Sequence, residues 1–263
     1  MDPDPLKPII PVKKDDDNAG YLHRQVIGSL GLLLPFTIWA IAGTRPTTGL
    51  DGELLTSISA YYYTGATAVF TGVLAALAVY LFTYTGYRNK SALWDRIAAW
   101  IAGAAAVVVA LYPTAAPADE LKLKWWTEPV GDIHGVAAAV LFLDFACISL
   151  FLFTKNNPNA PSTGTDKKVR NGIYRFCGIV MVVCIAWAAN NQFLSKPKKP
   201  IFLPEALTLV FFAVSWLAKG RADETALRLA GRSLHYVIHP TQFKAHVLGA
   251  IQEMKTPPNS GRP

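Results

Sequence analysis

Six long apolar runs, separated by polar connections, make up most of this chain. Each is close to the ~20 residues that a helix rising ~1.5 Å per residue needs to cross a ~30 Å hydrocarbon core. The alternation of these runs with polar connections predicts an all-α polytopic membrane protein, built as a six-helix transmembrane bundle. The expected spans are residues 26–43, 65–85, 93–112, 133–154, 173–190 and 201–217.

The composition supports this class. Hydrophobic residues make up 52% of the chain and charged residues only 16%, where soluble domains carry about a quarter. The formal charge of +7 comes from loops and chain ends rather than from a basic face. This distribution excludes nucleic acid as a partner and indicates membrane lipids. The three cysteines lie inside apolar runs at spacings that predict neither a disulfide framework nor a metal site.

Lys and Arg residues set the expected orientation. With six spans, 19 of the 25 fall on the side of the two chain ends and six on the other. The positive-inside rule then places both termini in the cytoplasm of a bacterial-type inner membrane. Residues 1–25 are expected to form a disordered cytoplasmic tail. Residues 218–263 are expected to form a second tail with an amphipathic helix, in which His235 and His239 lie at the interface rather than on a metal.

Asp144 is the most unusual polar residue, because it falls near the middle of the fourth span. A carboxylate at that depth is costly and by default marks a functional or pairing site. We expect it to be protonated and hydrogen-bonded across helices, and a role in proton or ion coupling stays open beside a structural one.

A second group of polar side chains is expected near the outer ends of the spans. His134, Glu205, Tyr63 and Asn191 share that leaflet in the predicted topology, and we expect them to form an outer-facing polar binding pocket above Asp144. The ordinary polarity of helix ends is the alternative. Ser57 or Ser59, with His134 and an acid, could also form a hydrolytic triad, but the chain has no GxSxG-type turn to support one.

Two stretches, SISAYYYTGATAVFTGVL and IHGVAAAVLFLDFACISLFLFTK, resemble a group of uncharacterised bacterial six-span membrane proteins with an S-x-S-A-Y-Y motif before the second span. The resemblance implies fold and location rather than activity. Those proteins carry His at the position of Tyr63. A Ser-x-x-x-His spacing and a late His-x-x-x-His are also similar to the ceramidase and adiponectin-receptor class of membrane hydrolases. Here Ser59 is followed by Tyr63, and six spans replace seven.

The expected function is a non-enzymatic one: binding, an accessory role or small-solute permeation, with no cofactor and with a small solute or a protein as the further partner. The alternative is an intramembrane metal-dependent or acid/base hydrolase that acts on lipid, with His134 as base. The sequence assigns no catalytic residue beyond that alternative.

Overall fold

The computed structural model describes residues 15–42, 54–86, 92–116, 123–155 and 164–223, and within these ranges it is helical, without strands. The chain divides into two units, Asp16–Arg221 and a second one made of both chain ends. The first unit, called the helical unit below, contains nearly all described residues. Residues 1–14 of the predicted tail (1–25) and the predicted amphipathic helix with His235 and His239 lie outside the described residues.

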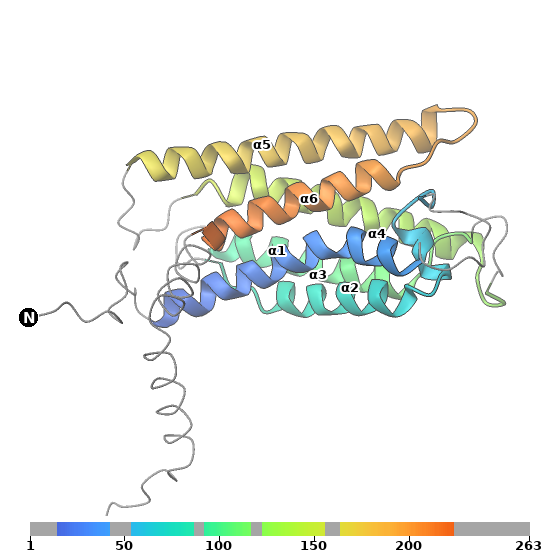
Figure 1. The fold of residues 1–263 in the computed structure, drawn as a ribbon, viewed down its shortest axis with the longest axis horizontal. Coiled ribbons are helices and arrows are strands. Elements are labelled where there is room, and N and C mark those ends of the chain that lie inside the picture. Colours follow the sequence, from blue (N-terminus) through green and yellow to red (C-terminus); the bar gives the residue numbers. More distant parts are fainter. Residues whose placement is uncertain (1–14, 43–53, 87–91, 117–122, 156–163, 224–263) are drawn as a thin grey trace, which may run out of the picture. The chain divides into compact units, whose positions relative to one another are not determined.

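The helical unit consists of long helices that run side by side (Figure 1). Their bounds are α1 Asp15–Ala42, α2 Thr67–Phe82, α3 Ala92–Leu111, α4 Glu128–Cys147, α5 Gly164–Ala189 and α6 Phe202–Lys219. A π turn, η3 (Ile148–Leu152), extends α4, and another, η4 (Asn190–Leu194), extends α5; η2 (Ser59–Tyr63) is a short 3-10 helix before α2. In the described part of the chain, five helices are long and apolar enough to cross a membrane, and α2 is a shorter apolar helix of 16 residues.

The predicted all-α membrane bundle is confirmed. Its helices overlap the predicted spans, but α4 and α5 begin earlier, at Glu128 and Gly164 instead of residues 133 and 173. The largest difference is at α1. That helix begins at Asp15 instead of Val26. The additional turns carry His23, which bonds to the Tyr80 carbonyl of α2, and Arg24, which donates to the Tyr84 hydroxyl just after α2. The prediction uses the apolar run to place the helix, and the first turns of α1 are polar. Those turns are therefore assigned to the N-terminal tail.

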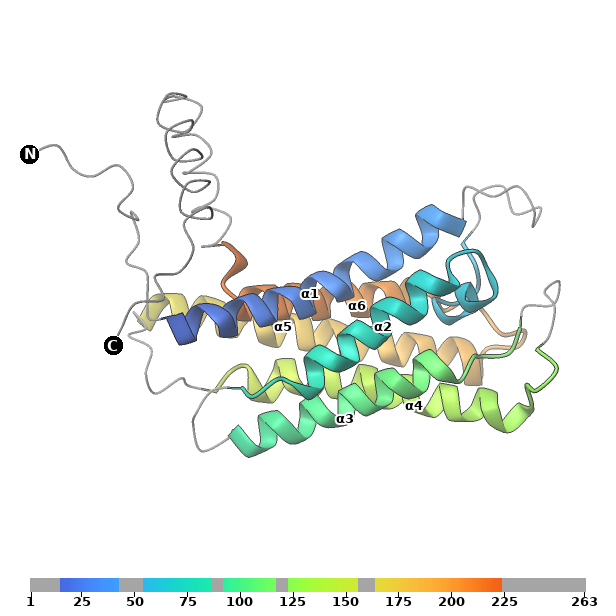
Figure 2. The same ribbon diagram turned by 90° about the horizontal axis from the view of Figure 1, so that it is seen from below.

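Neighbouring helices pack in the order α2, α3, α4, α5 and α6, and α1 covers α6. Two glycines allow α1 to approach closely: a Cβ at Gly31 would lie 2.6 Å from the Phe212 ring, and one at Gly28 would lie 2.9 Å from Leu217. Small residues permit such approach between membrane helices. The start of α1 and the end of α6 lie at the same end of the helical unit (Figure 2). There the Gln25 side-chain amide donates to the Gly220 carbonyl (2.7 Å).

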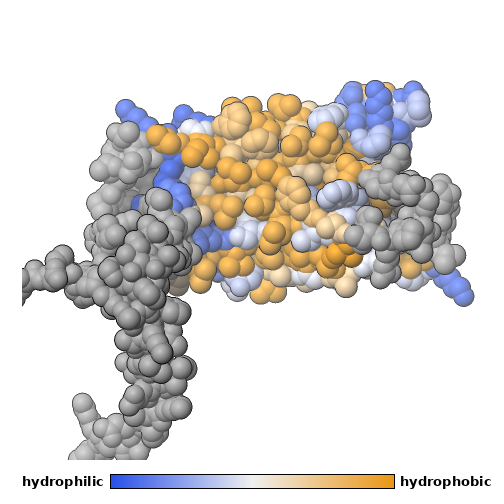
Figure 3. Space-filling model, in the orientation of Figure 1, coloured by the Kyte–Doolittle hydropathy of each residue, from blue (hydrophilic) through white to orange (hydrophobic). Residues whose placement is uncertain are grey.

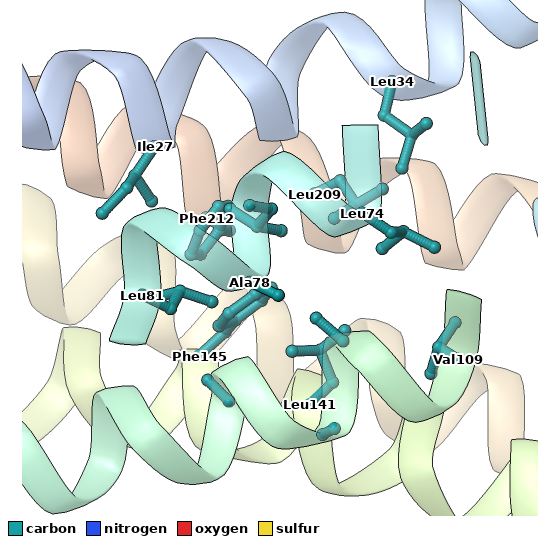
Figure 4. Close-up of a cluster of buried hydrophobic side chains, with 14 of the residues drawn as sticks. Ile27, Leu34, Leu74, Ala78, Leu81, Val109, Leu141, Phe145, Leu209 and Phe212 are labelled. Atoms are coloured by element: carbon teal, nitrogen blue, oxygen red, sulfur yellow. The ribbon is translucent and has the colours of Figure 1, made fainter. Parts of the chain in front are cut away.

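The core contains a large cluster of buried apolar side chains (Figure 4). Phe145 of α4 stacks on Phe212 of α6 with ring centroids 3.8 Å apart. Leu74, Ala78 and Leu81 bring α2 into the same cluster. The outside of the bundle is apolar as well, in a broad band between hydrophilic ends (Figure 3). Large exposed side chains on this outer surface include Phe36, Val79, Trp100, Val136, Phe151, Phe176 and Val183. A bundle that is apolar both inside and outside is typical of a protein that lipid surrounds.

Candidate functional site

The described residues before α2, from residue 54 on, lie at one end of the bundle beside the start of α2 (Figure 2). We call residues 54–64 the cap segment, and this end of the bundle the cap end. Ser57, Ile58, Ser59, Ala60 and Tyr61 are all buried. A buried connection must find partners for its backbone polar groups. Some of these are local, because the Ser57 hydroxyl accepts from the Ala60 N–H (3.1 Å). The Ile58 N–H and the Thr56 carbonyl find their partners at the start of α6. Side chains of the segment bond to α4 and to the connection after α3.

His134, in the second turn of α4, links the cap segment to the end of α3. Its Nδ1 lies 2.5 Å from the Tyr112 carbonyl oxygen and its Nε2 lies 2.8 Å from the Ser59 hydroxyl. Because a carbonyl only accepts hydrogen bonds, Nδ1 carries the proton. In the neutral ring, Nε2 is then an acceptor, and Ser59 donates to it. The imidazole is 4% exposed, so both of its nitrogens are used inside the protein.

Glu205, in the first turn of α6, binds the neighbouring position of the cap segment. Its Oε2 accepts the N–H of Ile58 at 2.7 Å, and the side chain is 7% exposed. The start of α6 is attached to the same segment through its backbone, since the N–H groups of Ile201 and Phe202 donate to the Thr56 carbonyl (2.6 and 3.0 Å). The first turn of a helix has N–H groups without an intrahelical acceptor, and here Thr56 supplies one.

Tyr63 and Asn191 fix the connections beside the cap segment. The Tyr63 hydroxyl donates to the Thr114 carbonyl (2.6 Å), just after α3. Burial, and next the electrostatic interaction with Tyr62, raise the pKa of Tyr63, so the phenol remains a donor at neutral pH. Asn191 is buried in η4. Its side-chain amide donates to the Pro200 carbonyl (2.8 Å), and its backbone carbonyl accepts from the Lys199 N–H (3.2 Å).

The structure therefore places four of the five predicted site residues at one end of the bundle, three of them bonded to the cap segment or part of it. The fifth, Asp144, lies ten residues beyond His134 on α4, roughly 15 Å along the helix axis. Its Oδ2 is buried and has no hydrogen-bond partner among the described residues. The hydrogen bond across helices that the sequence predicts for this carboxyl is not seen for that oxygen.

The chemistry open to the cap end is set by these contacts. Ser59, His134 and the Tyr112 carbonyl form a chain of hydroxyl, imidazole and orienting acceptor, the order found in nucleophile–base pairs. In the described ranges, no three His, Cys, Asp or Glu side chains come together as metal ligands. The same two hydrogen bonds of His134 also anchor the buried cap segment, because they join it to α4 and to the end of α3.

A second polar group, at the opposite end of the helical unit, was not predicted. Arg24, Asp95 and Lys219 are buried there, with exposed fractions of 4%, 7% and 7%. The Lys219 ammonium donates to the Phe153 carbonyl (2.7 Å) at the end of η3. Sequence reading assigned Arg24 and Lys219 to the tails. Their position within one turn of an apolar run is the signal that could have indicated a role inside the bundle.

Comparisons of the chain with protein-family models, with curated proteins and with solved structures find no match.

Proposed function

We propose that this chain is a non-enzymatic integral membrane protein that acts as a binding or accessory component, and that its cap end is the recognition end. The observation that carries the proposal is the bonding of the candidate side chains. His134, Glu205, Tyr63 and Asn191 each make a hydrogen bond to a backbone atom of a connection at the cap end. A catalytic side chain must be within reach of its substrate. A side chain that holds a connection in one conformation does not need to contact a substrate, and this is what the four hydrogen bonds favour.

The proposal includes the orientation. The cap end faces away from the cytoplasm of a bacterial-type inner membrane, and both termini are cytoplasmic. The distribution of 19 Lys and Arg residues on the terminal side supports this. The common location of the first and last helix ends supports an even number of crossings. Fusions of a periplasm-active and a cytoplasm-active reporter to each terminus test the orientation. Periplasmic activity at either terminus would contradict it.

The second candidate is a hydrolase that acts on lipid, and the contact between Ser59 and His134 favours it. In that reaction Ser59 Oγ attacks the ester carbonyl while its proton passes to His134 Nε2, and the leaving alcohol later takes that proton. The Tyr112 carbonyl would hold the imidazole in the tautomer that accepts the proton.

A fluorophosphonate probe separates the two functions, because it reacts with activated serine hydroxyls by losing fluoride. The full chain in lipid nanodiscs is treated with the probe, and its intact mass is measured. A non-enzymatic protein gains no adduct. One adduct per chain that disappears in Ser59→Ala and in His134→Ala, but persists in the control variant Ser57→Ala, would overturn the proposal in favour of the hydrolase.

Permeation is tested separately, since Asp144 is the residue that would carry it. Proton or ion flux into liposomes that Asp144→Asn abolishes would replace the binding role by a transport role. Flux equal to that of empty liposomes agrees with the binding or accessory role.

A further inference from the structure

Asp144 lies on α4 at the boundary between the side that faces the core and the side that faces outward. Residues three and four positions away lie next to it on the helix surface. Leu141 and Ile148, on one side of Asp144, are buried in the core. Val140 and Cys147, on its other side, are exposed. Asp144 itself is half-buried, so a partner outside the bundle can reach its side chain.

Within the described part of the chain, this carboxyl group lacks a hydrogen-bond partner for its buried oxygen, Oδ2. An unpaired carboxylate is far more costly in hydrocarbon than the neutral acid, so the group is held as the acid. A protonated carboxyl donates one hydrogen bond and accepts others. Rotation about the Cβ–Cγ bond exchanges its two oxygens, so the O–H is not confined to the buried side.

The exposed residues around Asp144 follow the spacing of a seam between two helices. At intervals of four, three and four residues, this seam consists of Val140, Asp144, Cys147 and Phe151. Positions d and a of a heptad repeat have the same spacing. All except Asp144 are apolar and exposed, Val140 by 38% and Phe151 by 62%. A single polar residue in such a seam fixes the register and the number of helices that pair.

A second neutral carboxyl is the group that complements the first completely. Each donates its O–H to an oxygen of the other, so that both donors are paired. A twofold-symmetric dimer brings the same surface of two chains together, and therefore the same residue near the axis. The side chains of Val140 and Cys147 are short, and short side chains let two membrane helices approach closely enough for the carboxyls to meet.

We propose that α4 forms the interface of a dimer of this chain, in which the Asp144 carboxyls of the two copies hydrogen-bond to each other. The chemistry favours a second copy as the occupant of this face, because a neutral acid is complementary to itself. The second copy also presents the same apolar neighbours at the same spacing. The contact supplies the partner that the bundle does not give to the buried carboxyl oxygen.

The test measures self-association of the full chain in liposomes. Protein labelled at its N-terminal amine is reconstituted over a range of protein-to-lipid ratios, and photobleaching steps count the chains in each particle. The wild-type protein is expected to become dimeric as the ratio rises. Asp144→Leu should raise the dissociation constant of the dimer at least about fivefold, since interhelical hydrogen bonds contribute ~1 kcal/mol.

Two variants show whether the chemistry of this side chain is responsible. Asp144→Asn should stay within about twofold of the wild-type dissociation constant, because an amide also donates and accepts hydrogen bonds. The matched control is Asp132→Leu, the same substitution at an exposed position near the start of α4. This control should associate like the wild-type protein. If Asp132→Leu and Asp144→Leu weaken the dimer equally, the proposal fails.

Cys147 gives a second measurement, which depends on geometry. It lies one turn from Asp144 in the seam, so the Cys147 thiols of two paired chains face each other. Oxidation by copper phenanthroline in liposomes should join wild-type chains into a disulfide-linked dimer and should not join Cys147→Ala chains. Cys177 and Cys184 are buried and remain in that variant as internal controls.

Monomers at every protein-to-lipid ratio would overturn the proposal and leave a different membrane helix as the occupant of this face. Equal association of the wild-type protein and Asp144→Leu would also overturn it, because the carboxyl would then not hold the dimer. If Asp144→Leu does not fold, the wild-type protein decides alone, and a dimer without a Cys147 cross-link would contradict the proposed interface.

Discussion

The hydrogen bond between Ser59 and His134 makes a quantitative prediction about the cap end. Ser59→Ala leaves the imidazole Nε2 buried without a donor, and such a group costs about 1–3 kcal/mol of stability. His134→Ala removes both bonds of the ring and leaves a cavity, so about 3 kcal/mol is expected. Once His134 is gone, Ser59→Ala removes little more. The two changes should therefore show a coupling of about 1–2 kcal/mol.

Reversible unfolding in mixed micelles, followed by circular dichroism, measures the four free energies of this double-mutant cycle. Ser57→Ala provides the matched control, because its hydroxyl is bonded locally to the Ala60 N–H and not to His134. Its cycle with His134→Ala should be additive within about 0.5 kcal/mol. Additivity in the Ser59 cycle would refute the argument, since it would mean that the cap segment does not depend on this contact.

Three further changes test neighbouring contacts by the same unfolding measurement. Glu205→Ala should destabilise the protein by about 2 kcal/mol by leaving the cap-segment N–H without an acceptor, whereas Glu205→Gln keeps an acceptor oxygen and should cost less; equal losses would contradict this. Tyr63→Phe should cost about 1 kcal/mol at pH 8 through the lost bond to Thr114. Because the folded-state pKa of this phenol is raised, that difference should persist below about pH 10 and shrink at higher pH; a difference that grows would contradict it. Gly31→Ala should cost about 1–3 kcal/mol, because the new methyl group meets the Phe212 ring, and an unchanged stability would mean that the helices are farther apart.

The sequence predicts the helices well because each span must satisfy two simple conditions, apolar composition and sufficient length. The apolar run over residues 93–112 corresponds to α3 with a shift of one residue at each end. Where a helix leaves the apolar layer, these conditions no longer apply. The early start of α1 at Asp15 is accompanied by contacts of His23 with α2 and of Arg24 with Tyr84 just after it, which no local pattern shows.

The site is predicted only in part, for a related reason. Topology places His134, Glu205 and Tyr63 at one end of the bundle, and the structure agrees. Topology does not show that residues 57–61 are buried at that end, so the Ile58 N–H is missed as the partner of Glu205, and Ser59 is paired with His134 only as part of a triad. The cations at the other end are missed because Lys and Arg near span ends are ordinarily interpreted as topology signals.

Hydrogen exchange of the cap-segment amides tests the central claim most directly. The account holds that this connection is part of the folded bundle, with the Ile58 N–H bonded to Glu205 and the segment anchored by His134. In nanodiscs, a peptide covering residues 55–63 should exchange orders of magnitude more slowly than an open loop, and Glu205→Ala or His134→Ala should remove the protection. Exchange as fast as that of an unstructured peptide in the wild-type protein would contradict the account.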